Sequence, residues 1–293
     1  KEKATKLIED MKTSNIDGKH YGNFEILKKE IFNYTDPING EVSKAQGIHI
    51  FTRDNVRIFF RLSGTGTVGA TIRVYIEKYI ELPKHIEVQI LGDMFGNVIH
   101  LYERDCSMQR KNQKILEEAP CHVLDKKIRE KLIADAVKIC KHLKYYSAGT
   151  IEFLVDKSGN YYFMEMNTRI QVEHPVTEMI TGINIVKQQL RIASGLPLEI
   201  AQEDVEFSCH AIECRINAED IFNDFAPSPG HVSFLHFPLG NQVRVESALY
   251  SGCDISPFYD SMVAKIIVCG STRLEAIRRM RRALEETIIQ GIK

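Results

Sequence analysis

Residue types capable of acid–base and metal chemistry are concentrated between residues 161 and 175, in the stretch YYFMEMNTRIQVEHP. Carboxylates, amides and a guanidinium recur there at a strict two-residue spacing: Glu165, Asn167, Arg169, Gln171 and Glu173. In an extended segment this period points all five side chains to one face. Such a face could bind a metal ion or an anion, or it could be the solvated face of an ordinary sheet.

The residues before this stretch favour the chemical interpretation. Two apolar runs, 151–155 and 161–164, flank the turn-forming sequence DKSGN at 156–160. An antiparallel hairpin over these runs would put Glu152 beside Glu165. Paired carboxylates repel each other unless a cation lies between them, and hard oxygen ligands suit Mg²⁺ shared with nucleotide phosphates. The sequence therefore predicts a metal site at this hairpin.

Helices and strands must hold these residues in place, and their patterns indicate a chain of mixed class. Helical spacing of apolar residues predicts helices over 1–12, 126–145, 176–193 and 274–287. Strand patterns predict hairpins over 47–62 and 84–103 and further strands at 210–216, 230–237 and 242–247. The sequence SGLP at 194–197 is a helix stop signal, and we expect a domain boundary near residue 196.

Composition excludes several classes of function. The 293 residues carry a net charge of −1 and are 44% hydrophobic, which is enough for ordinary globular cores. Because the numbers of basic and acidic residues are nearly equal, the protein has no overall electrostatic field that would favour binding to nucleic acid or to an acidic membrane surface. No apolar run approaches a membrane span, and the charged N-terminus lacks the apolar region of a signal peptide. We expect a soluble protein without nucleic-acid or membrane partners.

The cysteines indicate a compartment. Seven are widely spaced, and no two form a C-x-x-C pair. An odd number at wide spacing is typical of reduced, mostly buried thiols. We therefore expect a cytoplasmic protein, or one from another reducing compartment.

A glycine-rich loop near residue 64 could bind phosphate. Ser63, Gly64 and Thr65 combine a hydroxyl with exposed backbone amides, and Arg61 and Arg73 flank the loop. A surface loop that binds no ligand could have the same amino-acid composition.

Several long segments together resemble the biotin carboxylase module of biotin-dependent carboxylases, which is an ATP-grasp enzyme. The matching segments are EKYIELPKHIEVQ (77–89), ERDCSMQRKNQK (103–114), GTIEFL (149–154), EMNTRIQVEHPVTEMITG (165–182), ECRINAED (213–220), PSPG (227–230) and YDSMVAKI (259–266). The resemblance implies an α+β fold, with an antiparallel ATP-grasp lobe over 76–196 and a carboxylase C-terminal domain over 197–293.

The resemblance also implies a reaction and its residues. MgATP, with Mn²⁺ as an alternative metal, would convert bicarbonate to carboxyphosphate, and the carboxyl group would pass to biotin on a biotin carboxyl carrier protein. Metal would bind Glu152, Glu165 and Asn167, while Glu77, Lys78, Ile80, His85 and Gln109 would contact the nucleotide. The residues that would bind and activate bicarbonate and biotin are Lys114, Arg169, Gln171, Val172, Glu173 and Arg215. His85 could instead be structural, and Asn112 stands where many members carry His. The family commonly forms dimers, so a homodimer is one expected state.

Residues 1–75 resemble a different family. Their segments YTDPINGEVSKAQG (34–47) and RLSGTGTVGATIRVY (61–75) are similar to the small α+β C-terminal domain of phosphoglucomutases, whose loop binds a sugar phosphate. The two resemblances meet at residues 74–79 without a linker, which favours a chimera over a natural bifunctional enzyme.

Three functional hypotheses follow. The chain is an ATP-dependent carboxylase, a phosphohexomutase-related fragment that binds phosphosugars, or a non-catalytic chimera. The carboxylase family's N-terminal domain and lid would precede residue 77, where mutase-like sequence stands instead. We therefore expect carboxylase ancestry with little turnover by this chain.

Overall fold

The computed structural model describes residues 9–21, 24–35, 42–53, 56–63, 71–78 and 80–293. The chain divides into two compact units, Lys1–Glu81 and Leu82–Lys293. The predicted limits at residues 75 and 196 stay predictions.

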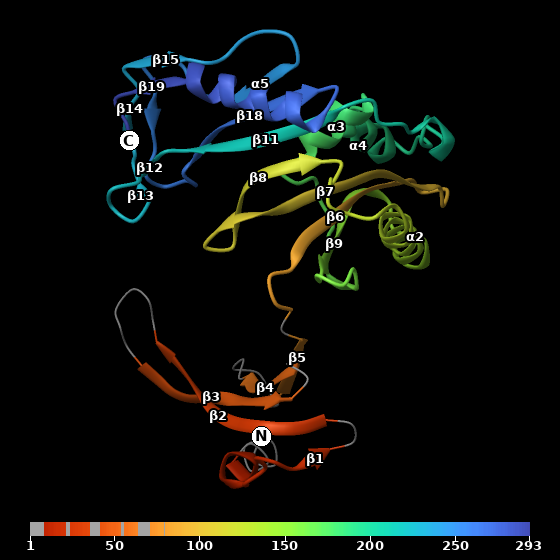
Figure 1. The fold of residues 1–293 in the computed structure, drawn as a ribbon, viewed down its shortest axis with the longest axis vertical. Coiled ribbons are helices and arrows are strands. Elements are labelled where there is room, and N and C mark those ends of the chain that lie inside the picture. The colour runs from red at the N-terminus through yellow and green to blue at the C-terminus, as the bar shows by residue number, and fades with distance from the viewer. Residues whose placement is uncertain (1–8, 22–23, 36–41, 54–55, 64–70, 79) are drawn as a thin grey trace. The chain divides into compact units, whose positions relative to one another are not determined.

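The first unit contains a five-stranded antiparallel sheet in the order β1-β2-β3-β4-β5 (Figure 1). Its strands are β1 (His20–Tyr21), β2 (Phe24–Thr35), β3 (Val42–Thr52), β4 (Val56–Ser63) and β5 (Thr71–Lys78). Ile26, Ile48 and Ile50 form its small core. The predicted hairpin around residues 53–55 is confirmed by the pairing of β3 with β4. Gly64 and Thr65 of the predicted phosphate loop lie outside the described residues.

The second unit is built on an eight-stranded sheet with the order β10-β9-β6-β7-β8-β11-β18-β16. Its strands are β6 (Lys84–Gly92), β7 (Val98–Arg110), β8 (Gln113–Ala119), β9 (Ser147–Val155), β10 (Tyr161–Asn167), β11 (His210–Asn217), β16 (Val243–Ser247) and β18 (Met262–Gly270). Every pairing is antiparallel. Three short pairs complete the unit: β12 (Glu219–Asp220) with β13 (Ala226–Pro227), β14 (Gly230–His231) with β17 (Asp254–Ile255), and β15 (Phe234–His236) with β19 (Ile288–Gln290).

Helices cover both faces of this sheet (Figure 1). They are α2 (Lys126–His142), α3 (His174–Thr181), α4 (Ile185–Ala193) and α5 (Arg273–Glu286), with a short 3₁₀ helix η1 (Gln202–Asp204). Ile86 and Val88 of β6 pack with Leu132 of α2 in one core cluster. On β11, Ile212 packs with Met280 of α5, whereas Ala211 packs with Ile180 of α3.

Strand alternation leaves one face for chemistry. Because successive residues point to opposite faces, Glu87 lies on the other face of β6 from Ile86. Glu213 and Arg215 share the α3 side of β11 with Ala211 for the same reason. The sheet therefore carries buried polar residues on the face that α3 covers.

Two helix predictions need comment. The predicted helix over 126–145 is confirmed as α2, although it ends at His142 and leaves Leu143 exposed. The single helix predicted over 176–193 is wrong, because Gly182 adopts a left-handed conformation with φ 71° and separates α3 from α4. Glycine is the usual residue at such a helix end, since no Cβ opposes the positive φ.

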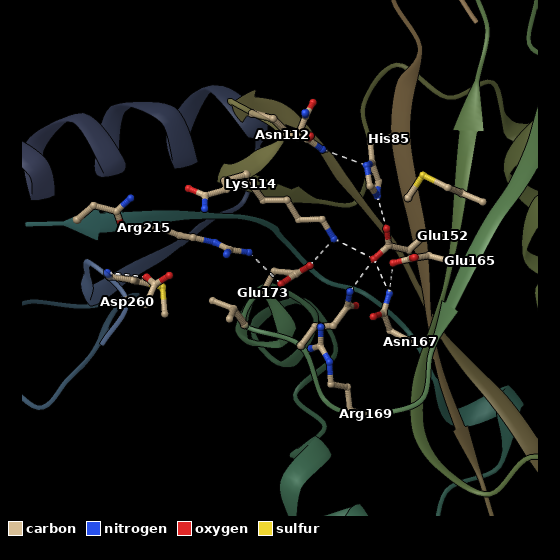
Figure 2. A pocket seen from close by; sticks show the side chains of 17 residues that line it. His85, Asn112, Lys114, Glu152, Glu165, Asn167, Arg169, Glu173, Arg215 and Asp260 are labelled. Atoms are coloured by element: carbon tan, nitrogen blue, oxygen red, sulfur yellow. Dashed lines mark hydrogen bonds and ion pairs between the residues drawn. The ribbon is translucent and has the colours of Figure 1, made fainter. Parts of the chain in front are cut away.

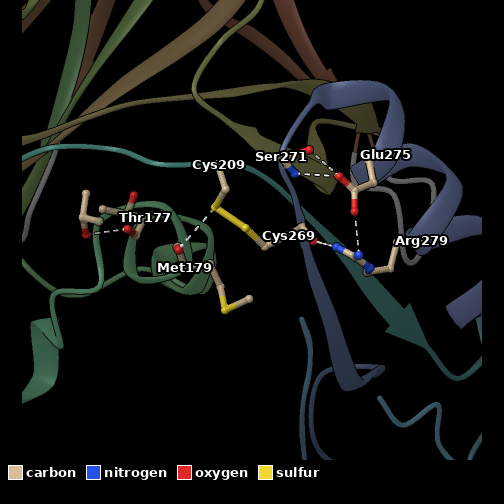
Figure 3. Close-up of a disulfide and its surroundings, with 8 residues drawn as sticks. Thr177, Met179, Cys209, Cys269, Ser271, Glu275 and Arg279 are labelled. Carbon is tan, nitrogen blue, oxygen red and sulfur yellow. Dashed lines mark hydrogen bonds and ion pairs between the residues drawn. A yellow bond between two sulfur atoms is a disulfide. The ribbon is translucent and has the colours of Figure 1, made fainter. Parts of the chain in front are cut away.

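The expectation that all thiols are reduced is wrong for one pair. Cys209 and Cys269 form a disulfide between the segment before β11 and the end of β18 (Figure 3). The antiparallel ladder pairs His210 with Gly270 and so brings together cysteines that are 60 residues apart, which sequence spacing cannot reveal. The other cysteines are free and buried: Cys106, Cys121, Cys140, Cys214 and Cys253.

Among the described residues, none of the helices combines the length and apolar character that crossing a membrane requires.

Candidate active site

A cavity of about 560 Å³ lies on the polar face of the second unit (Figure 2). Its lining includes these predicted residues: His85, Gln109, Lys114, Glu152, Glu165, Asn167, Arg169, Gln171, Val172, Glu173 and Arg215. Sequence reasoning gave no role to its other lining residues: Asn112, Gln113, Met164, Asn217, Asp260 and Met262. The tertiary structure thus gathers residues from segments more than a hundred positions apart.

Some predicted residues are not in this lining. Glu77, Lys78 and Ile80 belong to the first unit, as do Arg61, Ser63 and Arg73, so their relation to the cavity stays a prediction. The ladder of β4 and β5 pairs Arg61 with Arg73.

Strand register brings carboxylates together at one end of the cavity. The ladders pair Glu165 with Glu152 across β10 and β9, and Glu152 with Glu87 across β9 and β6. The predicted neighbourhood of Glu152 and Glu165 is therefore confirmed. Asp156 closes the β9–β10 turn by accepting hydrogen bonds from the backbone N–H groups of Ser158 and Asn160, as expected for this composition.

The prediction of one extended polar face over all five residues is wrong. Strand β10 ends at Asn167, and residues 168–173 form an irregular turn into α3. Pro175 follows in the first turn of α3, where its missing N–H costs nothing. Arg169, Gln171 and Glu173 reach the cavity from this turn rather than from a strand.

Glu152 is the most heavily contacted carboxylate of the cavity. It pairs with His85 at 2.6 Å and accepts hydrogen bonds from Asn167 at 2.9 Å and Gln171 at 2.7 Å. Burial alone would raise its pKa, but the His85 hydrogen bond and the Lys114 charge lower the pKa of Glu152 to about 2. Glu152 is therefore ionised at neutral pH.

Asn167 joins the two carboxylates of the hairpin. Its amide nitrogen donates to Glu152 and, at 3.0 Å, to Glu165, whose side chain is exposed. Two carboxylates and an amide on one rigid hairpin offer the hard oxygen ligands that Mg²⁺ prefers. The residues present thus fit a divalent cation shared with a phosphate ligand.

Lys114 lies at the centre of the cavity. Its ammonium is 2.7 Å from Glu173 and 3.1 Å from Glu152 (Figure 2). It also lies 2.6 Å from Glu87. Burial alone would lower the pKa of Lys114, but the charge of Glu87 and its acidic neighbours raises it above the usual value. Lys114 therefore stays charged. It follows a two-residue turn of Lys111 and Asn112, both with positive φ, which suits a tight hairpin.

Glu173 and Arg215 form the opposite wall. Glu173 lies at the N-terminus of α3. One oxygen of its carboxylate accepts a hydrogen bond from Lys114, and the other accepts one from Arg215 at 3.0 Å. Arg215 also donates from Nε to Glu117 at 2.7 Å. Lys265 donates to the carbonyl of Val172 at 2.8 Å and so fixes the turn before Glu173.

Arg104 is the main supporting residue that sequence reasoning missed. It is fully buried and donates to Glu87 at 2.6 Å, Gln89 at 2.7 Å and Gln171 at 3.1 Å. These contacts orient Gln171 and Glu87, each of which touches a lining residue. Arg104 stands between Glu103 and Asp105 in a run of charged residues, which the sequence alone does not distinguish from a solvated segment, and its partners come from distant segments.

A cavity with a carboxylate-rich hairpin, an antiparallel sheet and a central lysine defines an ATP-binding domain of the ATP-grasp class. Residues 53–201 match the family model "Carbamoyl-phosphate synthase L chain, ATP binding domain", and residues 213–293 match "Biotin carboxylase C-terminal domain". The chain belongs to the biotin carboxylase family, as a part of that module.

Similar proteins agree with this assignment. The chain is 55% identical to a biotin carboxylase of Nostoc sp. over 81% of this chain and 53% of that protein. It is 58% identical to biotin carboxylase 1 of Bacillus subtilis over 75% and 49% of the two chains. Its fold matches the biotin carboxylase domain of Hydrogenobacter thermophilus 2-oxoglutarate carboxylase with a TM-score of 0.73 at 56% identity, over 75% of this chain and 49% of that one. The chain thus spans about half the length of the curated relatives it matches.

The phosphoglucomutase resemblance has no support from these comparisons. Neither matching family model is a mutase, and the ATP-binding match begins at residue 53, within the segment assigned to the mutase. The chimera therefore rests on the sequence resemblance alone.

Proposed function

We propose that this chain supplies the metal, bicarbonate and biotin residues of an MgATP-dependent biotin carboxylase. The observation that carries the proposal is the Glu173 carboxylate, which lies between two cations, with Lys114 at 2.7 Å and Arg215 at 3.0 Å. A carboxylate flanked by cations suits a small acidic anion, because the cations hold the anion while the carboxylate takes its proton. Bicarbonate is such an anion.

The metal would be Mg²⁺ or Mn²⁺ held by Glu152 and Glu165, with Asn167 as a third ligand. When bound, it neutralises charge on the nucleotide phosphates. The ionised state of Glu152 supports this role, since its pKa is lowered to about 2. Glu165, which is exposed on the edge strand β10, is accessible to a ligand from solution.

Nucleotide contacts are assigned by resemblance. His85 and Gln109 line the cavity and contact each other at 3.0 Å, which suits a shared role near phosphate. Glu77, Lys78 and Ile80 are proposed for the adenine end.

The chemistry of the first step rests on the opposite wall. Arg169, whose exposed guanidinium donates to the carbonyl of Ile170, binds bicarbonate together with Gln171 and the backbone of Val172. Glu173 removes the bicarbonate proton, so that the bicarbonate oxygen attacks the γ-phosphorus of ATP. The bond from that phosphorus to the β,γ-bridging oxygen breaks, and carboxyphosphate and ADP form. Lys114 stabilises the negative charge of the phosphoryl group while it is transferred.

The second step transfers the carboxyl group of carboxyphosphate to the ureido nitrogen of biotin, while the C–O bond to phosphate breaks and the released phosphate takes the proton of that nitrogen. Arg215 stabilises the enolate-like charge that develops on biotin as its nitrogen loses a proton. This assignment is supported by the side chain's position at the cavity wall and by its two carboxylate contacts, which fix the guanidinium.

Partners and organisation belong to the same proposal. The biotin is presented by a carrier protein or domain, and the Hydrogenobacter relative, described as a dimer bound to MgADP, ADP and bicarbonate, supports a homodimer. We also propose domain limits at 75 and 196, and a cytoplasmic or other reducing location. The free cysteines support that location, whereas the Cys209–Cys269 disulfide does not.

The test is ligand binding by the chain itself. We expect calorimetric titration with MgADP to show binding that Glu165→Ala reduces at least tenfold. We expect ¹³C-bicarbonate resonances to broaden with the parent chain and not with Arg169→Ala. The control is Glu203→Gln, an exposed site away from the cavity. Equal MgADP affinity for the parent and Glu165→Ala would refute the metal assignment, and unchanged broadening with Arg169→Ala would refute the bicarbonate assignment.

A further inference from the structure

Two carboxylates lie side by side beneath the cavity wall and have no role in the proposed reaction. Glu117 of β8 and Glu213 of β11 are direct partners in the antiparallel ladder, and both are 0% exposed. Directly opposed residues have Cβ atoms about 4.5–5.5 Å apart and share a face of the sheet. Their carboxyl groups are therefore neighbours in the interior.

Most of their oxygens lack a partner. Oε2 of Glu117 and both carboxylate oxygens of Glu213 are buried without a hydrogen bond in the described part of the chain. A buried ionised carboxylate without partners is strongly unfavourable, and two adjacent ones repel each other. One proton between the two groups removes the repulsion and creates an O–H donor for a bare oxygen.

The surrounding charges decide which member holds the proton. Glu117 accepts from Arg215 at 2.7 Å, so it is the ionised member. Lys265 of β18 also faces Glu213, but its ammonium already contacts Glu246 at 2.6 Å and the carbonyl of Val172 at 2.8 Å.

The other charged neighbours are acidic. Glu173 at the start of α3 acts on both members, and Glu87 of β6 acts on Glu117. Burial, followed by the charges of Glu117 and Glu173, raises the pKa of Glu213 well above its usual value, and burial raises the pKa of Glu117 to about 7. The electrostatics agree with the hydrogen-bond pattern.

We propose that Glu117 and Glu213 share one proton at neutral pH and that the protonated pair positions Arg215 against Glu173. The shared proton follows from the ladder and the bare oxygens alone, whereas the value of that position for catalysis rests on the proposed carboxylase function. Both glutamates are positioning residues, because neither lines the cavity.

Loss of the proton has a structural consequence. A second negative charge beside Arg215 competes with Glu173 for the guanidinium. Arg215 then shifts toward the pair, and the wall that faces biotin changes. The position of Arg215 is therefore pH-dependent.

The sign of the stability effect can be stated. Groups whose pKa rises on folding bind more protons in the native state, so stability is full below the unfolded pKa near 4.5 and is lost as pH rises through the folded pKa. Glu213→Gln keeps the shape and the donor of the protonated acid but cannot ionise. Above pH 4.5 the free energy of unfolding should fall less steeply with pH in this variant than in the parent. The difference in slope should correspond to about one bound proton.

The first experiment measures protonation without any variant having to bind a ligand. Infrared spectra of the parent chain at neutral pH should contain the C=O band of a protonated carboxylic acid in a buried setting. Glu213→Gln should remove the band, and Glu203→Gln, at an exposed site, should keep it. Absence of the band in the parent, whether or not the variants fold, overturns the shared proton.

The second experiment follows Arg215 directly. The ¹⁵N resonance of its Nε–H, assigned with Arg215→Lys, should titrate with pH in the parent and should be pH-independent in Glu213→Gln. An Arg215 signal that ignores pH in the parent, or titrates equally in both proteins, overturns the positioning role. Failure of bicarbonate to bind would count against the proposed function and leave both of these readouts intact.

Discussion

At the scale of single residues, the cavity depends on buried charges that do not line it. Arg104 is fully buried beneath it and is bonded to Glu87, Gln89, Thr177, Thr150 and Gln171. Burial alone would raise the pKa of Glu87, but the charges of Arg104 and Lys114 outweigh burial and lower it. Both groups are thus ionised in the interior.

Breaking this pair should be costly. Removal of one partner of a buried ion pair typically costs about 3–5 kcal/mol, because the other charge is left uncompensated. We expect Arg104→Ala to lower the free energy of unfolding by about that amount in urea denaturation. The control is Arg281→Ala on α5, whose ion pair with Glu285 is exposed and should contribute about 0.5 kcal/mol or less. Equal losses in the two variants would contradict the role of Arg104.

At the scale of elements, the break between α3 and α4 sets the direction of the chain behind the cavity. Helix α3 begins beside Glu173 and ends at Gly182, and α4 begins at Ile185 with Asn184 as its N-cap. Glu178 of α3 accepts from the N–H of Ile185 at 2.7 Å and thereby links the two helices. A continuous helix could not make this contact.

The helix break gives a graded prediction. Beyond its neighbours in the chain, no described residue would have an atom within 4 Å of a Cβ at position 182, so the φ of 71° is what opposes a side chain there. We expect Gly182→Ala to cost about 1 kcal/mol in the free energy of unfolding and Gly182→Asn to cost less, because Asn tolerates the left-handed region better. Chemical denaturation measures both. A stabilising effect of Gly182→Ala would mean that the two helices can join.

At the scale of the molecule, all described residues that line the cavity belong to the second unit. The eight-stranded sheet, its helices and the network around Lys114 all lie within residues 82–293. The described residues of the core clusters on both faces of this sheet belong to this unit.

We therefore expect residues 82–293 to fold without residues 1–81. A protein of these residues alone should unfold in one cooperative transition, because it contains all eight strands of the sheet and the helices that pack on them. Its amide NMR spectrum for residues around Lys114 and Glu173 should match that of the full chain. Loss of dispersed signals in the shorter protein would show that the first unit is needed for folding.

The sequence by itself determined the local features of this protein. Turn composition predicted the β9–β10 hairpin, helical spacing predicted α2 and α5, and the pairing of Glu152 with Glu165 followed from the hairpin. These features depend on neighbours within a few tens of residues, and the family motifs are local strings as well. The roles that the resemblance gives to the cavity residues stay predictions.

Only the tertiary structure decided which distant residues meet. Glu117 and Glu213 are paired by a ladder between strands 96 positions apart, and Cys209 and Cys269 meet through the pairing of β11 with β18. Arg104 forms hydrogen bonds with residues of strands β6 and β9 and of helix α3. Strand order and register arise from the packing of whole faces against α2, α3 and α5, and no local pattern encodes that choice. The sequence thus shows which side chains are capable of chemistry, whereas the folded sheet determines which of them lie next to each other.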